Sequence, residues 1–379
     1  MKIVIFANAF HTISGGDKIF VEFAKHWLSW GEDVDVITNK SGRLFAMENG
    51  LSPKYIHLWP ASFSDKLGIF ISSAYKTIHS LIRSFFIDPK NIDIVFSASF
   101  IWPDLLPGLI LKLKKPKLKW VVACYVFLPN PLSRGYRGSL FNGIVLFLVQ
   151  KISILIISLF ADQVFVASYL DSNRFFKRIK VNAIRGGVDF PYFSKFPPEK
   201  KIFDAVFVGR FHPQKNVDDL LDIWQKVTKK RKGLKLALIG GGYMEDELKE
   251  QVYTNNMGGN VLFLGILDGL EKARVLKSSK LFLSTSQFDS GNIALDEALA
   301  SGVPGVVYNL PRLDYPQGVI KITLGDEKTF IKWVLTLLEK ESLRRSLSIK
   351  GQSFASSLDW NIKARQALES IKDLYVKEN

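Results

Sequence analysis

Short runs of β-branched and aromatic residues alternate along this chain with longer segments in which apolar positions recur at helical spacing. The first run covers residues 3–7, and the first helical pattern covers residues 18–29. Parallel strands need a helix-sized connection between them, so this alternation predicts parallel sheets covered by helices. The pattern therefore indicates an α/β fold.

The strand-like runs form two series. The first lies at residues 3–7, 34–38, 56–59, 94–97, 120–125, 163–167 and 181–184, and the second at residues 205–208, 236–239, 261–264, 281–284 and 305–307. Between them, prolines and glycine over residues 187–200 interrupt both periodicities. We therefore expect two Rossmann-like doubly wound domains, over residues 1–190 and 200–359, that face each other across a cleft.

The charge of the chain points to an anionic partner. The 379 residues carry a net charge of +15, and residues 1–190 hold 23 Lys and Arg against 13 Asp and Glu. Nucleic acid, an anionic membrane surface and a phosphorylated small molecule all fit such an excess. No known nucleic-acid-binding motif accompanies the charge, so nucleic acid is not expected.

The single cysteine and one pair of acidic residues bear on the cellular compartment and on metal binding. Cys124 is the single cysteine, which excludes an intramolecular disulfide and fits a reducing, cytoplasmic compartment. Asp33 and Asp35 imitate a metal-binding Asp-x-Asp pair, but they open a strand, whereas ligands of doubly wound sheets bind beyond strand carboxyl ends. We expect no metal site and no cofactor.

Three stretches combine apolar and basic character. Residues 63–86 interleave apolar and cationic positions, and residues 112–119 hold five lysines. Residues 140–160 are apolar but contain Gln150 and Lys151 mid-span, which favours a buried or interfacial helix over a transmembrane one. We expect peripheral contact with an anionic membrane at its inner face. For residues 63–86, a core-facing helix with a solvated cationic face is an open alternative.

Two loops beyond predicted strands could hold an anion. Gly15 and Gly16 precede the first helix, where backbone amides can approach a phosphate closely; an ordinary tight turn is the alternative. Arg210 and Lys215 follow the strand at residues 205–208 and could grip a diphosphate. The alternative for these two cations is solvated surface charge.

A third constellation precedes and enters a short helix. The helix is expected to begin near Gly291 and Asn292, so the amides of these residues and of Ile293 would face an anion. Glu297 lies one turn further on the same face as Ile293, within reach of a sugar diol. Asp289 stands just ahead of the helix. A capping Asp289 and a solvated Glu297 are the alternatives.

These motifs resemble those of the retaining nucleotide-sugar glycosyltransferases of the two-Rossmann-domain (GT-B) type, known as family 4 or group 1. The early double glycine matches Gly15 and Gly16, and the Gly-Arg-x-x-Pro-x-Lys loop matches Gly209, Arg210, Pro213 and Lys215. The family's two acids separated by seven residues, followed by Ala-x-Ala-x-Gly-x-Pro, match Asp289, Glu297, Ala298, Ala300, Gly302 and Pro304.

The resemblance implies a role for each part of the chain. The first domain would bind the acceptor, the second the nucleotide sugar, and a helix over residues 360–379 would cross back to the first domain. Glu297 would bind the donor ribose, while Arg210 and Lys215 would neutralise the diphosphate and Asp289 would hold the transferred sugar. The implied activity is sugar transfer from a nucleoside diphosphate to a hydroxyl of a glycan or lipid-linked acceptor, in cell-envelope polysaccharide or glycolipid synthesis, without a metal.

Two departures from the family pattern keep a second function open. Asp289 replaces the usual glutamate, and no histidine follows the strand that ends near Cys124, where many members carry one. A departing phosphate oxygen can take the acceptor proton in a retaining reaction, so transfer without that histidine is possible. The alternative is a catalytically silent nucleotide-sugar-binding homologue that acts as a partner subunit.

Overall fold

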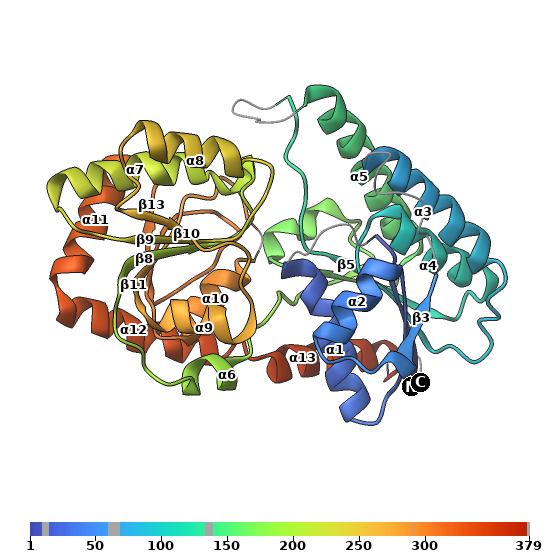
Figure 1. Ribbon diagram of the computed structural model, residues 1–379. Helices are drawn as coiled ribbons and strands as arrows, with labels where there is room; N and C mark the ends of the chain where they lie inside the picture. The colour runs from blue at the N-terminus through green and yellow to red at the C-terminus, as the bar shows by residue number, and fades with distance from the viewer. Residues whose placement is uncertain (10–14, 60–68, 133–138, 290, 377–379) are drawn as a thin grey trace. The chain divides into compact units, whose positions relative to one another are not determined.

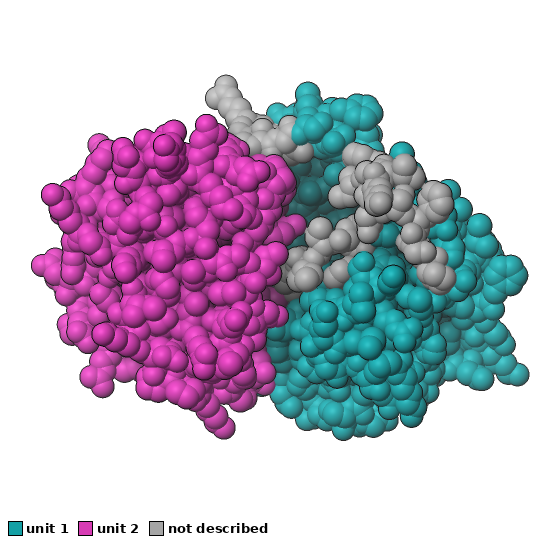
Figure 2. Space-filling model, viewed as in Figure 1, with its two compact units in different colours: residues 1–186, 360–379 teal, residues 187–359 magenta. Residues whose placement is uncertain are grey.

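The structure is a computed structural model that describes residues 1–9, 15–59, 69–132, 139–289 and 291–376 (Figure 1). It divides into two units, one of Met1–Gly186 with Trp360–Asn379 and one of Gly187–Asp359 (Figure 2). Each unit is built on its own parallel sheet with helices on its faces. The expected α/β class with two Rossmann-like domains is confirmed.

The structure places the domain boundary earlier than residue 190, directly after Gly186. The Val188 amide donates to the Leu358 carbonyl (2.9 Å), and Val188 pairs with Asp359 in an isolated parallel bridge. Phe193 is buried in the core of the second unit. Backbone pairing and burial, rather than the breaks in periodicity, therefore decide where the second unit begins.

The first unit holds a seven-stranded parallel sheet of order β3-β2-β1-β4-β5-β6-β7. Its strands are β1 (Lys2–Ala7), β2 (Asp33–Thr38), β3 (Ile56–Leu58), β4 (Ile94–Ser97), β5 (Lys119–Cys124), β6 (Gln163–Val166) and β7 (Lys180–Ala183). Its helices are α1 (Gly15–Ser29), α2 (Lys40–Glu48), α3 (Ile69–Ser84), α4 (Trp102–Lys114), α5 (Leu140–Phe160) and α13 (Trp360–Val376), with short 3₁₀ turns at Pro53–Tyr55 and Tyr169–Arg174.

The C-terminal helix α13 is part of the first unit because it packs against α1. The indole Nε1 of the fully buried Trp27 donates to the Ala364 carbonyl at 2.9 Å. Lys372 pairs with Glu32 at 2.6 Å. A buried hydrogen bond and a charged pair therefore hold α13 to the unit in which the chain began.

A buried carboxyl joins the loops that follow β1 and β4, which are neighbours in the first sheet. Asp104 lies in the first turn of α4, where its two oxygens accept from the Ala9 amide (2.8 Å) and the Ser99 hydroxyl (2.6 Å). Complete burial outweighs these hydrogen bonds and raises the pKa of Asp104 to about 7. The folded protein therefore holds this proton far more tightly than an unfolded chain does.

The second unit holds a six-stranded parallel sheet of order β10-β9-β8-β11-β12-β13. Its strands are β8 (Phe203–Val208), β9 (Leu236–Ile239), β10 (Val261–Phe263), β11 (Ser279–Ser284), β12 (Gly305–Tyr308) and β13 (Val319–Ile322). Its helices are α6 (Phe190–Lys195), α7 (Val217–Lys230), α8 (Glu245–Thr254), α9 (Gly269–Lys277), α10 (Ile293–Ala300), α11 (Glu327–Glu339) and α12 (Glu341–Ser356), with a 3₁₀ turn at Pro213–Lys215.

All twelve strands expected from the sequence are present, and β13 is the strand that the sequence pattern missed. It lies at the edge of the sheet and pairs with β12 alone. Three of its four residues remain partly exposed to solvent. Such a short, partly exposed strand does not show the continuous apolar run by which the other strands were predicted. Pairing with a neighbour, rather than local composition, makes it a strand.

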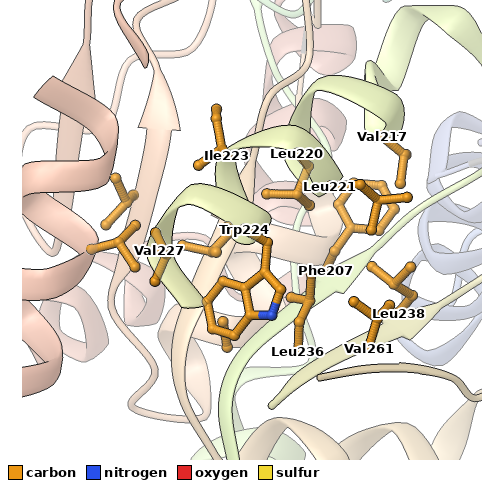
Figure 3. Packing of buried hydrophobic residues seen from close by; sticks show 14 of the residues in the cluster. Phe207, Val217, Leu220, Leu221, Ile223, Trp224, Val227, Leu236, Leu238 and Val261 are labelled. Carbon is orange, nitrogen blue, oxygen red and sulfur yellow. The ribbon is translucent and has the colours of Figure 1, made fainter. Parts of the chain in front are cut away.

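Helix α7 anchors the loop that carries two of the candidate site residues. Its apolar positions recur every three or four residues and are buried against β8, β9 and β10, with the Trp224 ring at the centre of the cluster (Figure 3). Asp218 and Asp219 lie in its first turn, where negative charge favours a helix N-terminus. The helix therefore fixes the end of the loop that enters it.

Two glycines in the turn after β9 let this turn close against the loop after β8. Gly240 and Gly242 have φ angles of 143° and 154°. A Cβ atom on Gly240 would lie 1.9 Å from the Gly209 carbonyl oxygen, and one on Gly242 would lie 2.4 Å from the Phe211 carbonyl oxygen. The Phe211 amide donates to the Gly241 carbonyl at 2.8 Å. Only glycine permits this approach of the two backbones.

We expect the substitution Gly240→Ala to lower the free energy of unfolding by about 2 kcal/mol or more, because the added methyl group must displace the Gly209 carbonyl. Urea denaturation would measure the change. Gly258→Ala is the matched control, since a Cβ there meets nothing within 4 Å. Equal losses for the two variants would show that the turn is not closely packed.

The raised pKa of Asp104 predicts a pH-dependent stability. An unfolded aspartate carboxyl ionises near pH 3.8, while the folded one keeps its proton until about pH 7. The contribution of Asp104 to the free energy of unfolding is therefore fully present below about pH 4. It is lost as pH rises through about 7, and the loss amounts to up to about 4 kcal/mol. Relative to Asp104→Asn, the parent should lose stability across this window in urea titrations. A constant difference between the two proteins would contradict the assigned cause.

Candidate functional site

Three loops of the second unit meet at the carboxyl edge of its sheet. They follow β9, β8 and β11, which are consecutive in the sheet, and their described residues are 240–242, 209–216, and 285–289 with 291–292. The order of strands reverses between β8 and β11, since β9 and β10 lie on one side of β8 and β11 to β13 on the other. Doubly wound sheets bind their ligands at such a reversal.

The loop after β8 carries a positive field. Arg210 is exposed, and His212 caps the following 3₁₀ turn, with its Nδ1 accepting from the Gln214 amide at 3.1 Å. Partial burial lowers the pKa of His212, and the charges of Arg210 and Lys215 lower it further. Two cations therefore lie close enough to act on this ring, which is an environment that favours an anion.

Hydrogen bonds join this loop to the one after β11. The Gln287 amide donates to the Gln214 carbonyl at 3.0 Å, and the Gln214 side chain donates to the Phe288 carbonyl at the same distance. The Thr285 hydroxyl donates to the Asn216 carbonyl at 2.8 Å. Asn216 itself has a φ of 53°, which turns the chain into α7. The two loops therefore form one connected edge.

Two of the predicted site residues meet on this edge. Lys215 Nζ lies 2.6 Å from Asp289 Oδ2, and the side chains keep 17% and 8% of their surface exposed. The other oxygen of Asp289 lies 3.5 Å from the Gly291 amide. The sequence predicts that Lys215 and Asp289 contact the same ligand, but it does not predict that they pair with each other. A ligand phosphate would therefore share Lys215 with this carboxylate or exchange with it.

Helix α10 begins where the sequence predicts. Asn292 is its N-cap, with Oδ1 accepting from the Leu295 amide at 3.1 Å. The Tyr315 hydroxyl is 2.8 Å from Asp296 and 3.2 Å from the Asn292 carbonyl. These contacts fix the first turn, so the amides of Gly291, Asn292 and Ile293 stand at the start of a helix that is held in place by side-chain hydrogen bonds.

Glu297 is buried one turn into α10 and forms an ion pair that the sequence did not indicate. Its side chain is 3% exposed, and Oε1 accepts from Lys272 Nζ at 3.0 Å. Lys272, in the first turn of α9, also contacts Asp268 at 2.8 Å. Burial acts to lower the pKa of Lys272, but the charges of Glu297 and Asp268 outweigh it and keep the pKa above its ordinary value. In the described part of the chain, no hydrogen bond is made to Oε2 of Glu297.

The predicted residues thus fall into two groups and a remainder. Arg210, Lys215 and Asp289 gather on the joined loops, whereas Glu297 belongs to the Lys272 pair, and no ion pair or hydrogen bond among the described residues links it to the first group. Gly15 and Gly16 are the first residues of α1 in the other unit. Residues 10–14 of that turn lie outside the described residues, as does residue 290. Lys272 was missed because a single lysine in a helix gives no sequence signal.

Comparison with known proteins relates part of the chain to a family. Residues 191–353 match the family model described as "Glycosyl transferases group 1". The chain is 25% identical over 187 residues to phosphatidyl-myo-inositol mannosyltransferase of Mycolicibacterium smegmatis, a match that covers 48% of this chain and 47% of the relative. It is 29% identical over 107 residues to alpha-monoglucosyldiacylglycerol synthase of Streptococcus pneumoniae, covering 28% and 24%. The chain thus spans about a quarter to a half of these relatives' lengths.

Among solved structures, the Anabaena protein HepE in complex with UDP and glucose shares the fold. The TM-score is 0.75 at 15% identity, and the match covers 98% of this chain and 99% of that one. The fold is the two-domain GT-B fold of glycosyltransferases. Residues 191–353 are thus similar to the group 1 glycosyl transferases, and the chain as a whole shares the fold of these structures.

Proposed function

We propose that this chain is a retaining glycosyltransferase that moves a sugar from a nucleoside diphosphate to a hydroxyl of a glycan or lipid-linked acceptor. The observation that carries the proposal is the joined edge after β8 and β11, where Arg210, Lys215 and Asp289 stand at the strand-order reversal of the second sheet. Cations and helix-end amides at that edge suit a diphosphate leaving group.

In this proposal the diphosphate binds to Arg210 and Lys215. The lowered pKa of His212 supports a negatively charged ligand, since both cations already act on that ring. Lys215 is paired with Asp289 at 2.6 Å before the donor arrives. Sharing this lysine with the donor would bring the Asp289 carboxylate close to the transferred sugar, where it can accept from the sugar hydroxyls.

The ribose of the donor would bind to Glu297. Lys272 holds Oε1 at 3.0 Å, and Oε2 has no hydrogen-bond partner in the described part of the chain, so one acceptor is oriented and available. The amides of Gly291, Asn292 and Ile293 would contribute donors at the start of α10. Lys272 would thus act as a positioning residue for Glu297 rather than as a contact to the donor.

The reaction would keep the configuration at the anomeric carbon. The acceptor oxygen attacks that carbon on the face from which the diphosphate leaves, the bond to the diphosphate breaks with its electron pair on the phosphate oxygen, and that oxygen takes the acceptor proton. Arg210 and Lys215 stabilise the charge that develops, and this stabilisation is larger in the transition state than in the ground state. In this scheme no metal and no further cofactor is needed.

The acceptor and location are proposed from the named relatives. The names phosphatidyl-myo-inositol mannosyltransferase and alpha-monoglucosyldiacylglycerol synthase contain a phospholipid and a glucosylated lipid. We propose that this chain works in cell-envelope glycolipid or polysaccharide synthesis, as a cytoplasmic protein at the inner face of the membrane. Its first unit would bind the acceptor and its second unit the nucleotide sugar.

We expect Arg210→Ala and Glu297→Gln each to weaken nucleoside diphosphate binding by about tenfold to a hundredfold, because each removes a charge-assisted hydrogen bond to the ligand. Calorimetry with UDP and GDP would measure the affinity of the full chain. Arg231→Ala and Glu250→Gln are matched controls, since both residues are exposed in the same unit outside the site. If the site variants bind as tightly as these controls, the assignment of the donor site is wrong.

Transfer with retention is tested separately from binding. The chain would be offered UDP- and GDP-linked sugars with lipid and glycan acceptors, and the product's anomeric configuration would be read by NMR. We expect the α-linked donor to give an α-linked product. A β-linked product would overturn the retaining mechanism, while donor binding without transfer would favour the catalytically silent homologue.

A further inference from the structure

Helix α3 turns its polar residues inward. Ser72, Lys76, Ser80 and Ser84 recur every fourth position and are buried, with no more than 4% of their surface exposed. Apart from Arg83, the exposed positions of the same helix and its end are apolar, among them Ile71, Tyr75, Ile78, Ile82, Phe85 and Phe86. A helix on a water-facing surface shows the opposite arrangement. The alternative of a core-facing apolar side with a solvated cationic face, left open by the sequence, is therefore wrong for α3.

Helix α5 shows the same inversion over a greater length. Its buried polar side chains have partners within the unit: Gln150 Oε1 accepts from the Leu128 amide (2.7 Å), and Ser153 Oγ accepts from the Trp102 indole (3.1 Å). Six of its exposed residues form a stripe with spacings of three and four, made of Phe141, Ile144, Leu148, Ile152, Leu155 and Leu159. The apolar face is therefore available because the polar face is needed for packing.

The length and apolar character of α5 match those of a membrane-spanning helix. Among the described residues, it is the helix long and apolar enough to cross a bilayer, with 21 residues and a mean hydropathy of 2.3 over its most apolar window. A third of that window is buried inside the protein. Its inner face packs on α4, which also packs on α3 (Figure 1). The helix is thus a wall of the first unit with one side left apolar.

Charge near the two stripes is mainly positive, and the exposed Asp88 after the end of α3 is an exception. Residues 69–87, 105–119 and 139–160 contain no Asp or Glu. The exposed cations of these segments are Arg83, Lys114, Lys117 and Lys151. Lys114 Nζ donates to the carbonyls of Phe85 and Ile87 (2.8 and 2.7 Å), which places a cation at the C-terminal end of α3 beside the exposed Phe85 and Phe86. Apolar and cationic side chains therefore adjoin.

We propose that the exposed stripes of α3 and α5 form a docking surface that inserts into one leaflet of an anionic lipid bilayer. The apolar side chains would enter the acyl boundary while the neighbouring lysines and arginine meet lipid phosphates. Inward-facing small and polar residues are also typical of helices whose outer side contacts lipid. A second copy of the chain would bring like charges together, so an anionic bilayer fits the charge better. The inference rests on the proposed membrane location and names the surface responsible for it.

The first test replaces one apolar residue on each helix. We expect Ile78→Ser with Ile152→Ser to lower the partition coefficient of the full chain onto phosphatidylglycerol vesicles by about tenfold or more, measured by co-sedimentation. Ile266→Ser with Ile349→Ser is the matched control, because these isoleucines are at least as exposed but lie in the second unit. The control should stay within about twofold of the parent, and thermal melting should show that both variants remain folded.

The second test reports insertion directly. Cys124 is fully buried, and burial raises the pKa of its thiol far above the usual range, so it should not react with a label. A polarity-sensitive fluorophore on Ile152→Cys should shift to the blue when vesicles are added. The same label on Ile349→Cys should not shift. Absence of a shift at position 152, with the parent bound to the vesicles, would overturn insertion.

The remaining outcomes separate this inference from the proposed function. If the serine variant binds vesicles as well as the parent, the lysines alone attach the chain and the docking surface is refuted. If the parent binds no anionic vesicle at low salt, both the surface and the membrane location are refuted. If the serine variant instead turns a dimer into a monomer in sedimentation, the stripes bind a second copy and not lipid. Nucleoside diphosphate affinity should be unchanged in the variant, so failure of donor binding in the parent concerns the enzyme proposal alone.

Discussion

The ion pair between Lys215 and Asp289 is the contact on which the candidate site depends. It joins the loop after β8 to the loop after β11 at 2.6 Å, and hydrogen bonds from Gln214 and Gln287 hold the same two loops in register. The pair keeps a cation and an anion close together at the carboxyl edge of the sheet. In the proposed function, a phosphate-bearing ligand would change the balance of that pair, because it would compete with Asp289 for the lysine. Sugar positioning and leaving-group stabilisation would then be coupled through one side chain.

The site also depends on groups that no ligand would touch. Lys272 orients the buried carboxylate of Glu297, and the Gly240 turn lets the loops after β8 and β9 approach closely. Leaving Glu297 buried without a cation would carry a large desolvation cost, so its partner is part of the structure of the site. The family motif names Glu297 but not the lysine, since that contact comes from a different helix.

The same rule, that buried polar groups need partners, explains the unusual surface of the first unit. Helices α3 and α5 turn serine, lysine and glutamine side chains inward, and Gln150 and Ser153 find hydrogen-bond partners there. Their isoleucine, leucine and phenylalanine residues are consequently left outside. Apolar and basic composition alone predicted contact with a membrane surface. The direction in which each helix faces depends on what it packs against.

The sequence by itself determined the class of the fold, twelve of its strands, the beginning of α10 and the loops that carry Arg210 and Asp289. These features are local: strand and helix periods, glycine and proline breaks, and motif spacings lie within a few residues of each other. Only the tertiary structure decided the edge strand β13, the boundary after Gly186, the partners of Lys215 and Glu297, and the outward direction of the apolar stripes. Each of these depends on residues distant in the chain, whose contacts no local pattern records.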